Sequence, residues 1–232
     1  MSATLLANLV VIVGAFVQGA AGLGFAMIVV PLLALIDLSL VPGPAMIALL
    51  SVAVIMAIQG RQEVSRPDLL GLLPGLLAGS ALGAWLLALL PRTLLAPALG
   101  AIILIGVAAI LSGRQVALNR PNLLVGGMVT GAMGTIAGIH GPPLAILFAG
   151  SPSGRARATI AWSFVLGAVL SLPHLAQARS DIAGLTRGLS LLPGLLVGLL
   201  LARLALGRSP PAWPRLAMLT LATSSRVERR RG

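Results

Sequence analysis

Long apolar stretches, separated by short polar ones, follow one another along almost the whole chain. Seven uncharged runs can be identified: 1–36, 38–60, 69–91, 93–113, 121–154, 158–178 and 188–202. A helix needs about 20 apolar residues to cross the hydrocarbon core of a membrane, and all but the last run reach that length. The pattern predicts an all-α polytopic membrane protein. It lacks the alternating segments of about 10 residues that a membrane β-barrel requires.

The composition agrees with this prediction. Hydrophobic residues make up 58% of the chain and charged residues only 9%, whereas roughly a quarter of a soluble domain is charged. The net charge is +11, but the arginines stand singly or in pairs between apolar runs. They therefore suit lipid headgroups at loops, and no nucleic-acid partner is expected. The absence of cysteine excludes disulfides and thiol chemistry.

Two pairs of similar segments occur in the same order and predict an internal duplication. GAFVQGAAGLG at 14–24 resembles GGMVTGAMGTIAG at 126–138, an alignment that pairs Gly22 with Gly134. LLPGLLAG at 72–79 matches LLPGLLVG at 191–198 in seven of eight positions. Leucine and glycine matches are common in such a chain, so the shared order carries the prediction.

The duplication divides a single transmembrane domain, 1–232, into repeats 5–112 and 122–225. Each repeat is expected to begin with a broken apolar segment, at 5–36 and 122–150. The further segments are expected at 43–60, 69–90 and 94–112, and at 156–178, 185–206 and 213–225. The last of these is too short to span a membrane unaided, at about 20 Å as a helix. In the linker between the repeats, Pro121 is expected to act as a helix stop.

The first segment of each repeat is too long for one straight membrane helix. Residues 5–36 would form a helix of about 48 Å, against a hydrocarbon core of about 30 Å. The run must bend, break or re-enter, and Gly19, Gly22 and Gly24 mark the natural break. The corresponding break is expected across 134–143. The repeats are parallel or inverted according to whether each broken segment crosses the membrane.

Such breaks predict a substrate site. Non-helical backbone at membrane depth is tolerated only inside protein or beside a wet cavity, and transporters built from repeats bind substrate there. Half-helix N-termini then face anionic groups. The candidate substrate-binding residues are Gln18, Gly19, Gly22, Gly24, Gly131, Gly134, Gly138, His140, Gly141 and Pro142. The alternative is that these glycines only let helices pack closely.

Three charged or titratable residues add to this prediction. His140 is the one titratable residue in the second break, so it is a candidate to donate to an anion or relay a proton. The alternative is that it caps a backbone carbonyl. Arg155 and Arg157 open a predicted helix, where the helix dipole disfavours cations. They are weaker candidates for anion contacts, the alternative being that they reach lipid headgroups.

Both broken segments resemble those of the sulfite exporter TauE/SafE family of bacterial membrane permeases. The resemblance rests on QGAAGLGFAMIVVPLL at 18–33, GAMGTIAGIHGPPLAILF at 131–148 and the basic turn GRQEVSRPD at 60–68. It runs from about residue 5 to residue 222. It implies a transporter of small anions, typically sulfite or sulfonates. The family's glycine motifs fall on Gly19, Gly22, Gly24, Gly134, Gly138, Gly141 and Pro142. GLGFAM here is shorter than the glycine run of many members.

We therefore expect a secondary transporter for a small anion, multi-pass in the bacterial inner membrane, with the bilayer and the anion as its partners. No nucleophile elbow or HExxH motif is present, so no enzyme, metal or cofactor is expected. The C-terminal arginines predict a cytoplasmic C-terminus; they are Arg226, Arg229, Arg230 and Arg231. The alternatives are a passive anion channel, a membrane accessory subunit without a substrate, and an intramembrane enzyme that uses His140.

Overall fold

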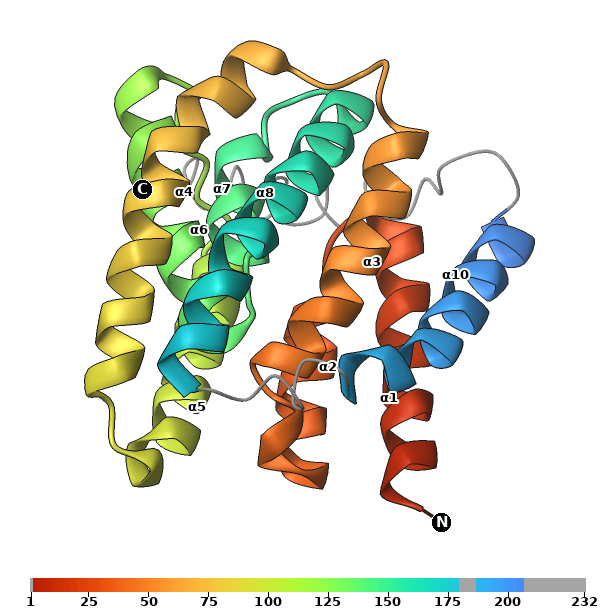
Figure 1. The fold of residues 1–232 in the computed structure, drawn as a ribbon. Helices are drawn as coiled ribbons and strands as arrows, with labels where there is room; N and C mark the ends of the chain where they lie inside the picture. The colour runs from red at the N-terminus through yellow and green to blue at the C-terminus, as the bar shows by residue number, and fades with distance from the viewer. Residues whose placement is uncertain (1, 180–186, 207–232) are drawn as a thin grey trace, which may run out of the picture.

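The computed structural model describes residues 2–179 and 187–206, and every regular element in these ranges is a helix (Figure 1). The elements are α1 (Ala3–Ala21), α2 (Phe25–Ile36), η1 (Leu38–Leu40), α3 (Gly43–Gln59), α4 (Arg66–Leu89), α5 (Arg92–Leu111), α6 (Arg120–Ala137), α7 (Gly141–Phe148), α8 (Ser153–Arg179), η2 (Gly188–Leu191) and α10 (Leu192–Leu206). Five helical stretches in this part of the chain are long and apolar enough to cross a membrane. The prediction of an all-α membrane protein is confirmed.

Most predicted segments coincide with helices to within a few residues. Runs 43–60, 69–90 and 94–112 correspond to α3, α4 and α5. The expected last segment, 213–225, and the C-terminal arginines lie outside the described residues. One prediction was wrong: Pro121 lies in the first turn of α6 and so begins a helix instead of stopping one. A proline suits this position because the first residues of a helix need no N–H partner within it.

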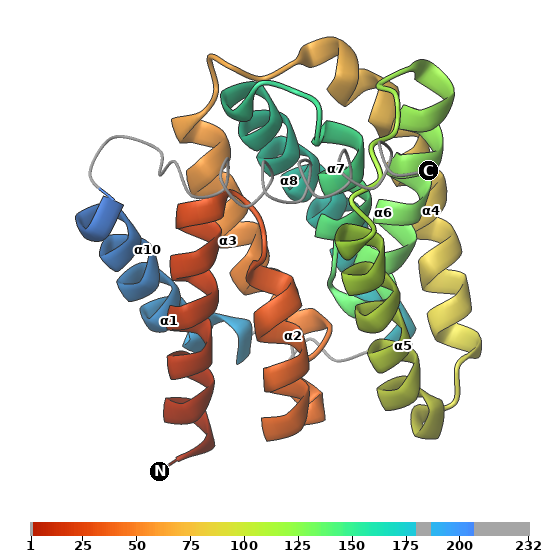
Figure 2. The same ribbon diagram turned by 180° about the vertical axis from the view of Figure 1, so that it is seen from behind.

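Each broken segment folds into a helical hairpin. In Figures 1 and 2, α2 runs back along α1, and α7 runs back along α6, in the opposite direction to the first hairpin. Gly14 of α1 faces Val29 of α2, and Gly126 of α6 faces Leu147 of α7, in contacts with no room for a further Cβ. The hairpins are therefore packed along their length.

Glycines join the two predicted repeats by direct backbone contact. A Cβ placed on Gly75 or Gly79 of α4 would overlap the backbone of Leu124 or Met128 on α6. Gly127 of α6 meets the α4 backbone in the same way. Such contacts let two helices approach to backbone distance, which is how membrane helices associate without a hydrophobic driving force. Helix α4 is thus packed closely on helix α6.

The reciprocal pair, α10 and α1, packs in the same manner. A Cβ on Gly194 would lie 2.6 Å from the carbonyl oxygen of Asn8, and one on Gly198 would overlap the carbonyl of Ile12. The Asn8 side chain also accepts a hydrogen bond from the Gly194 N–H at 2.8 Å and donates to the Ser190 carbonyl at 3.0 Å. Both LLPGLL motifs found in the sequence therefore supply helix-packing glycines.

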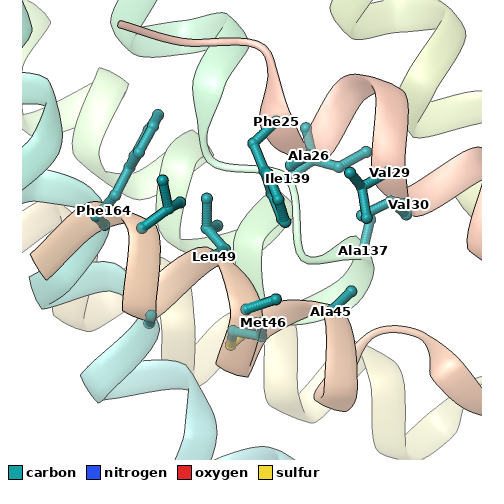
Figure 3. Packing of buried hydrophobic residues seen from close by; sticks show 14 of the residues in the cluster. Phe25, Ala26, Val29, Val30, Ala45, Met46, Leu49, Ala137, Ile139 and Phe164 are labelled. Atoms are coloured by element: carbon teal, nitrogen blue, oxygen red, sulfur yellow. The ribbon is translucent and has the colours of Figure 1, made fainter. Parts of the chain in front are cut away.

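The hairpin tips meet α3 and α8 at the centre of the molecule. Figure 3 shows Phe25 and Ile139, which follow the two breaks, in one apolar cluster with Met46 and Leu49 of α3 and Phe164 of α8. All five side chains are buried. The core thus holds both breaks against the same two helices.

Replacing Gly79 by Ala is expected to lower the thermal midpoint of the detergent-solubilised protein, because the added Cβ overlaps the Met128 carbonyl. Overpacking of this kind costs about 1–3 kcal/mol. The control is Gly100→Ala on α5, where no atom lies within 4 Å of the added Cβ. Helix propensity should make that change stabilising by about 0.5–1 kcal/mol. Size-exclusion chromatography after heating measures both midpoints, and equal shifts would contradict the packing described.

Candidate functional site

The first break is made by two glycines in left-handed conformations. α1 ends at Ala21, and Gly22 (φ +87°) and Gly24 (φ +118°) carry the chain into α2 at Phe25. Residues with a Cβ rarely adopt these angles, so glycine is required at both positions. The break expected at 19–24 is present, although Gly19 itself lies within α1, where its Cβ would lie 2.9 Å from that of Ala202.

The side chain of Gln18 bridges this break. Its Nε2 donates to the carbonyl of Gly22 at 3.3 Å, and its Oε1 accepts the N–H of Phe25 at 2.9 Å. Gln18 is 1% exposed, so both ends of its amide group are used inside the protein. It satisfies one orphan group of each helix at the point where the ladder of backbone hydrogen bonds is interrupted.

Arg157 reaches the same break from α8. Its Nη1 donates to the carbonyl of Ala20 at 3.2 Å and its Nη2 to that of Gly19 at 3.0 Å. A Cβ on Gly22 would lie 2.7 Å from the Cγ of Arg157, so the side chain lies directly on the break. A cation at the C-terminus of α1 is also favoured by the helix dipole. The guanidinium therefore caps α1.

The second break has the same cap geometry, displaced by one helical turn. α6 ends at Ala137, and Gly138 (φ +72°) donates its N–H to Gly134 at 2.7 Å, as Gly22 donates to Gln18 at 2.8 Å. The structure therefore pairs Gly22 with Gly138, whereas the sequence alignment paired it with Gly134. Gly134 occupies the position of Gln18, and so the second break has no bridging side chain.

The imidazole of His140 fills the space beside Gly134. His140 is the N-cap of α7 and is completely buried. A Cβ on Gly134 would overlap the ring, and one on Gly167 of α8 would lie 2.6 Å from its Cδ2. The ring centroid of Phe164 is 6.1 Å away. Neither ring nitrogen makes a well-formed hydrogen bond among the described residues, although the backbone of Gly167 lies close enough to interact with the ring.

The N-terminus of α7 offers few backbone donors. Of its first three residues, Gly141, Pro142 and Pro143, only Gly141 carries an N–H. An anion at this helix end would therefore depend on that amide and on the His140 side chain. Gly131 lies within α6, seven residues before Gly138, and packs on Leu76 and Ser80 of α4.

Arg155 is already paired. Its Nη2 lies 2.6 Å from the Oδ2 of Asp68, and its Nε donates to the same oxygen at 3.2 Å. The Nη2 also donates to the Oγ of Ser65 at 3.0 Å. This ion pair joins the start of α4 to the start of α8.

Buried hydroxyls form a feature that the search for breaks and titratable residues missed. Six side-chain hydroxyls are 0% exposed; they belong to Ser80, Thr130, Thr135, Thr159, Ser163 and Ser171. Polar side chains inside a membrane bundle are costly unless they have partners. The spacing of Thr159, Ser163 and Ser171, at four and then eight residues, was visible in the sequence.

Comparison with protein families agrees with this architecture. The family model described as sulfite exporter TauE/SafE matches residues 6–227 of the chain. The chain belongs to the sulfite exporter TauE/SafE family. TauE/SafE proteins are membrane transporters, so the resemblance seen in the glycine motifs is confirmed. No curated protein and no solved structure was found to match.

A cavity of about 240 Å³ lies between α5, α6 and α7 of this TauE/SafE protein, and it differs from the two breaks in its chemistry. Its lining is apolar except for Asn122, and it includes Pro142, Met133 and Gly106. An anion finds little to bind there, because proline and aliphatic side chains provide no donor and the Asn122 amide already donates to the Ala117 carbonyl at 2.8 Å. The second break, with its free imidazole, is the better candidate for anion chemistry.

Replacing Gln18 by Leu is expected to destabilise this TauE/SafE protein, because the Phe25 N–H and the Gly22 carbonyl lose their partner. Each buried group left unsatisfied costs about 1–3 kcal/mol. The control is Gln59→Leu at the exposed end of α3, where surface substitutions change stability by about 0.5 kcal/mol or less. Thermal midpoints of the two purified variants are compared. Similar midpoints would contradict the bridging role.

Proposed function

We propose that this TauE/SafE protein is a secondary transporter of a small anion in the bacterial inner membrane, with sulfite or a small organosulfonate as substrate. The observation that carries the proposal is the free imidazole of His140 at the N-cap of α7. Family membership supports the transport of an anion. The residue proposed to bind the anion is argued from the second break alone.

A buried polar side chain without a partner is a cost that stability does not explain. Leaving such a group unsatisfied costs about 1–3 kcal/mol. The protonated ring has two N–H donors, which suit the several acceptor oxygens of a sulfur oxyanion, and hydrogen bonds between charged groups are the stronger kind. The amide of Gly141 and the start of α7 add to the favourable potential. An anion bound beside the ring would accept hydrogen bonds from the two N–H groups of the protonated imidazole.

The first break plays the structural part in this proposal. Gln18 and Arg157 already satisfy its exposed backbone groups. Gly22 and Gly24 supply the turn, and Gly138 does so in the second break. Of the candidate residues, only His140 and Gly141 are therefore proposed to contact the substrate. Gly134 leaves the space that the imidazole of His140 occupies.

We further propose that repeats 5–112 and 122–225 are inverted and that both hairpins are re-entrant. The opposite directions of the α1–α2 and α6–α7 hairpins support this arrangement (Figures 1 and 2). So does the reciprocal packing of α4 on α6 and of α10 on α1. Transporters built from inverted repeats bind substrate where such broken helices meet.

Complete burial of His140 favours a transporter over a passive channel. A channel conducts through a continuous wet path, whereas alternating access encloses its site between two openings. Saturable flux driven by an imposed proton gradient supports the transporter, and unsaturable flux would support the channel. An accessory subunit predicts no flux at all.

Replacing His140 by Leu is expected to lower anion flux while raising the thermal midpoint. Flux should fall about tenfold or more, because a hydrogen bond to a charged group contributes about 1.5–3 kcal/mol. The midpoint should rise because two unsatisfied buried nitrogens are removed. The assay is uptake of sulfite, sulfate, thiosulfate and small sulfonates into proteoliposomes of the purified protein.

His174→Leu is the matched control, because the Nδ1 of His174 lies 2.7 Å from the Leu170 carbonyl of its own helix and the residue lies about two helical turns beyond Gly167. It should leave the flux nearly unchanged. Normal flux in a folded His140→Leu protein would refute the proposed site. Lost flux together with a lowered midpoint would instead assign His140 a structural role.

A further inference from the structure

One face of α8 carries a row of small residues, three of them hydroxylated. Thr159, Ser163, Gly167 and Ser171 follow one another at intervals of four, which places them along the same side of a helix. The three hydroxylated residues are 0% exposed, and Gly167 is also buried. These four residues are called the α8 polar row.

At one end the row joins hydroxyls from two other helices. The Oγ of Ser171 lies 2.7 Å from the Oγ1 of Thr135 on α6 and 3.5 Å from the Oγ of Ser80 on α4. The Oγ1 of Thr135 also donates to the carbonyl of Gly131 at 3.0 Å. Three helices therefore place hydroxyls at a single buried position.

At the other end the row leads to the partly exposed start of α8. The Oγ of Ser163 donates to the carbonyl of Thr159 at 2.8 Å, and the Oγ1 of Thr159 accepts the N–H of Ser65 at 3.0 Å. Ser65 in turn accepts from Arg155, whose side chain is 44% exposed and is paired with Asp68. The polar groups thus continue from the surface to the interior.

His140 lies on the middle of the row. A Cβ added to Gly167 would lie 2.6 Å from the Cδ2 and 2.8 Å from the Nε2 of the imidazole. Both ring nitrogens are buried and have no partner among the described residues. A row of small residues alone would indicate only close packing, but the free imidazole set against it points to a ligand.

The hydroxyls are able to donate hydrogen bonds to an anion, and they have other hydrogen-bond partners when no anion is bound. Ser163 and Thr135 donate to carbonyls of their own helices, which satisfies them at rest. A hydroxyl rotates about its C–O bond, so it exchanges that bond for one to an anion. Close packing alone would be achieved more cheaply with alanine, since buried hydroxyls carry a desolvation cost.

We propose that the α8 polar row, with His140 at its middle, is the path along which the anion crosses the protein. The hydroxyls of Ser163 on one side, and of Ser171 with its two partners on the other, take the place of water around the anion. The path rests on the proposed function, because it assigns the route to and from the His140 site.

The natural absence of cysteine allows a direct test with single-cysteine variants. Ser163→Cys and Ser171→Cys, both nearly isosteric, are reconstituted in proteoliposomes and treated with 2-sulfonatoethyl methanethiosulfonate, an anionic reagent that does not cross lipid. Ala168→Cys is the matched control, because Ala168 is 0% exposed but lies beside the row on a different face of α8. Val169→Cys, 51% exposed on the apolar outside, controls for lipid-facing positions.

Both row variants should react about tenfold or more faster than either control. Apolar surroundings raise the pKa of a thiol, and each unit of that rise lowers the reactive thiolate fraction about tenfold, so the control thiols react slowly. Modification of Ser163→Cys should also abolish anion flux, and a reducing agent should restore it. Labelling of both row variants no faster than Ala168→Cys would overturn the path, even where the unmodified protein transports. Failure of the proposed function is read separately, as absence of flux in the untreated wild-type protein.

Discussion

Inside a membrane the backbone groups exposed by a helix break find no water, so each break must be satisfied by the protein itself. The rest of this structure depends on how that requirement is met. At the first break, Gln18 and Arg157 bind four backbone groups, the carbonyls of Gly19, Ala20 and Gly22 and the N–H of Phe25. At the second, Gly134 stands where Gln18 would, and the space holds the unpaired imidazole of His140. Side chains therefore bridge the first break, whereas the second break contains a polar side chain without a hydrogen-bond partner among the described residues.

Arg157 ties this local chemistry to the global fold. It belongs to α8, yet it caps the end of α1, so a helix from the later part of the chain holds the first break. Two residues earlier in the chain, Arg155 pairs with Asp68 at the start of α4. The pair is half-buried, since the Arg155 side chain is 44% exposed and that of Asp68 only 10%. Together the two arginines fix the start of α8 relative to both α1 and α4.

Much of the architecture was predictable from sequence, because apolar run length and glycine position are local properties. The helices, the TauE/SafE membership and breaks at Gly22, Gly24 and 134–143 follow from them. The alignment paired Gly22 with Gly134, whereas the glycines that end the two helices with a positive φ are Gly22 and Gly138; glycine-rich segments match in several registers, and only backbone geometry selects between them. The role of Arg157 was missed because its partners lie 137 and 138 positions away.

The glycine contacts have a mechanical consequence. Because α4 touches α6 backbone to backbone, and α10 touches α1 in the same way, each of these two helix pairs is a close-packed unit. Interfaces this close resist sliding, since any shift drives a Cα into a carbonyl. Any motion that separated α4 from α6, or α10 from α1, would therefore have to break these backbone contacts.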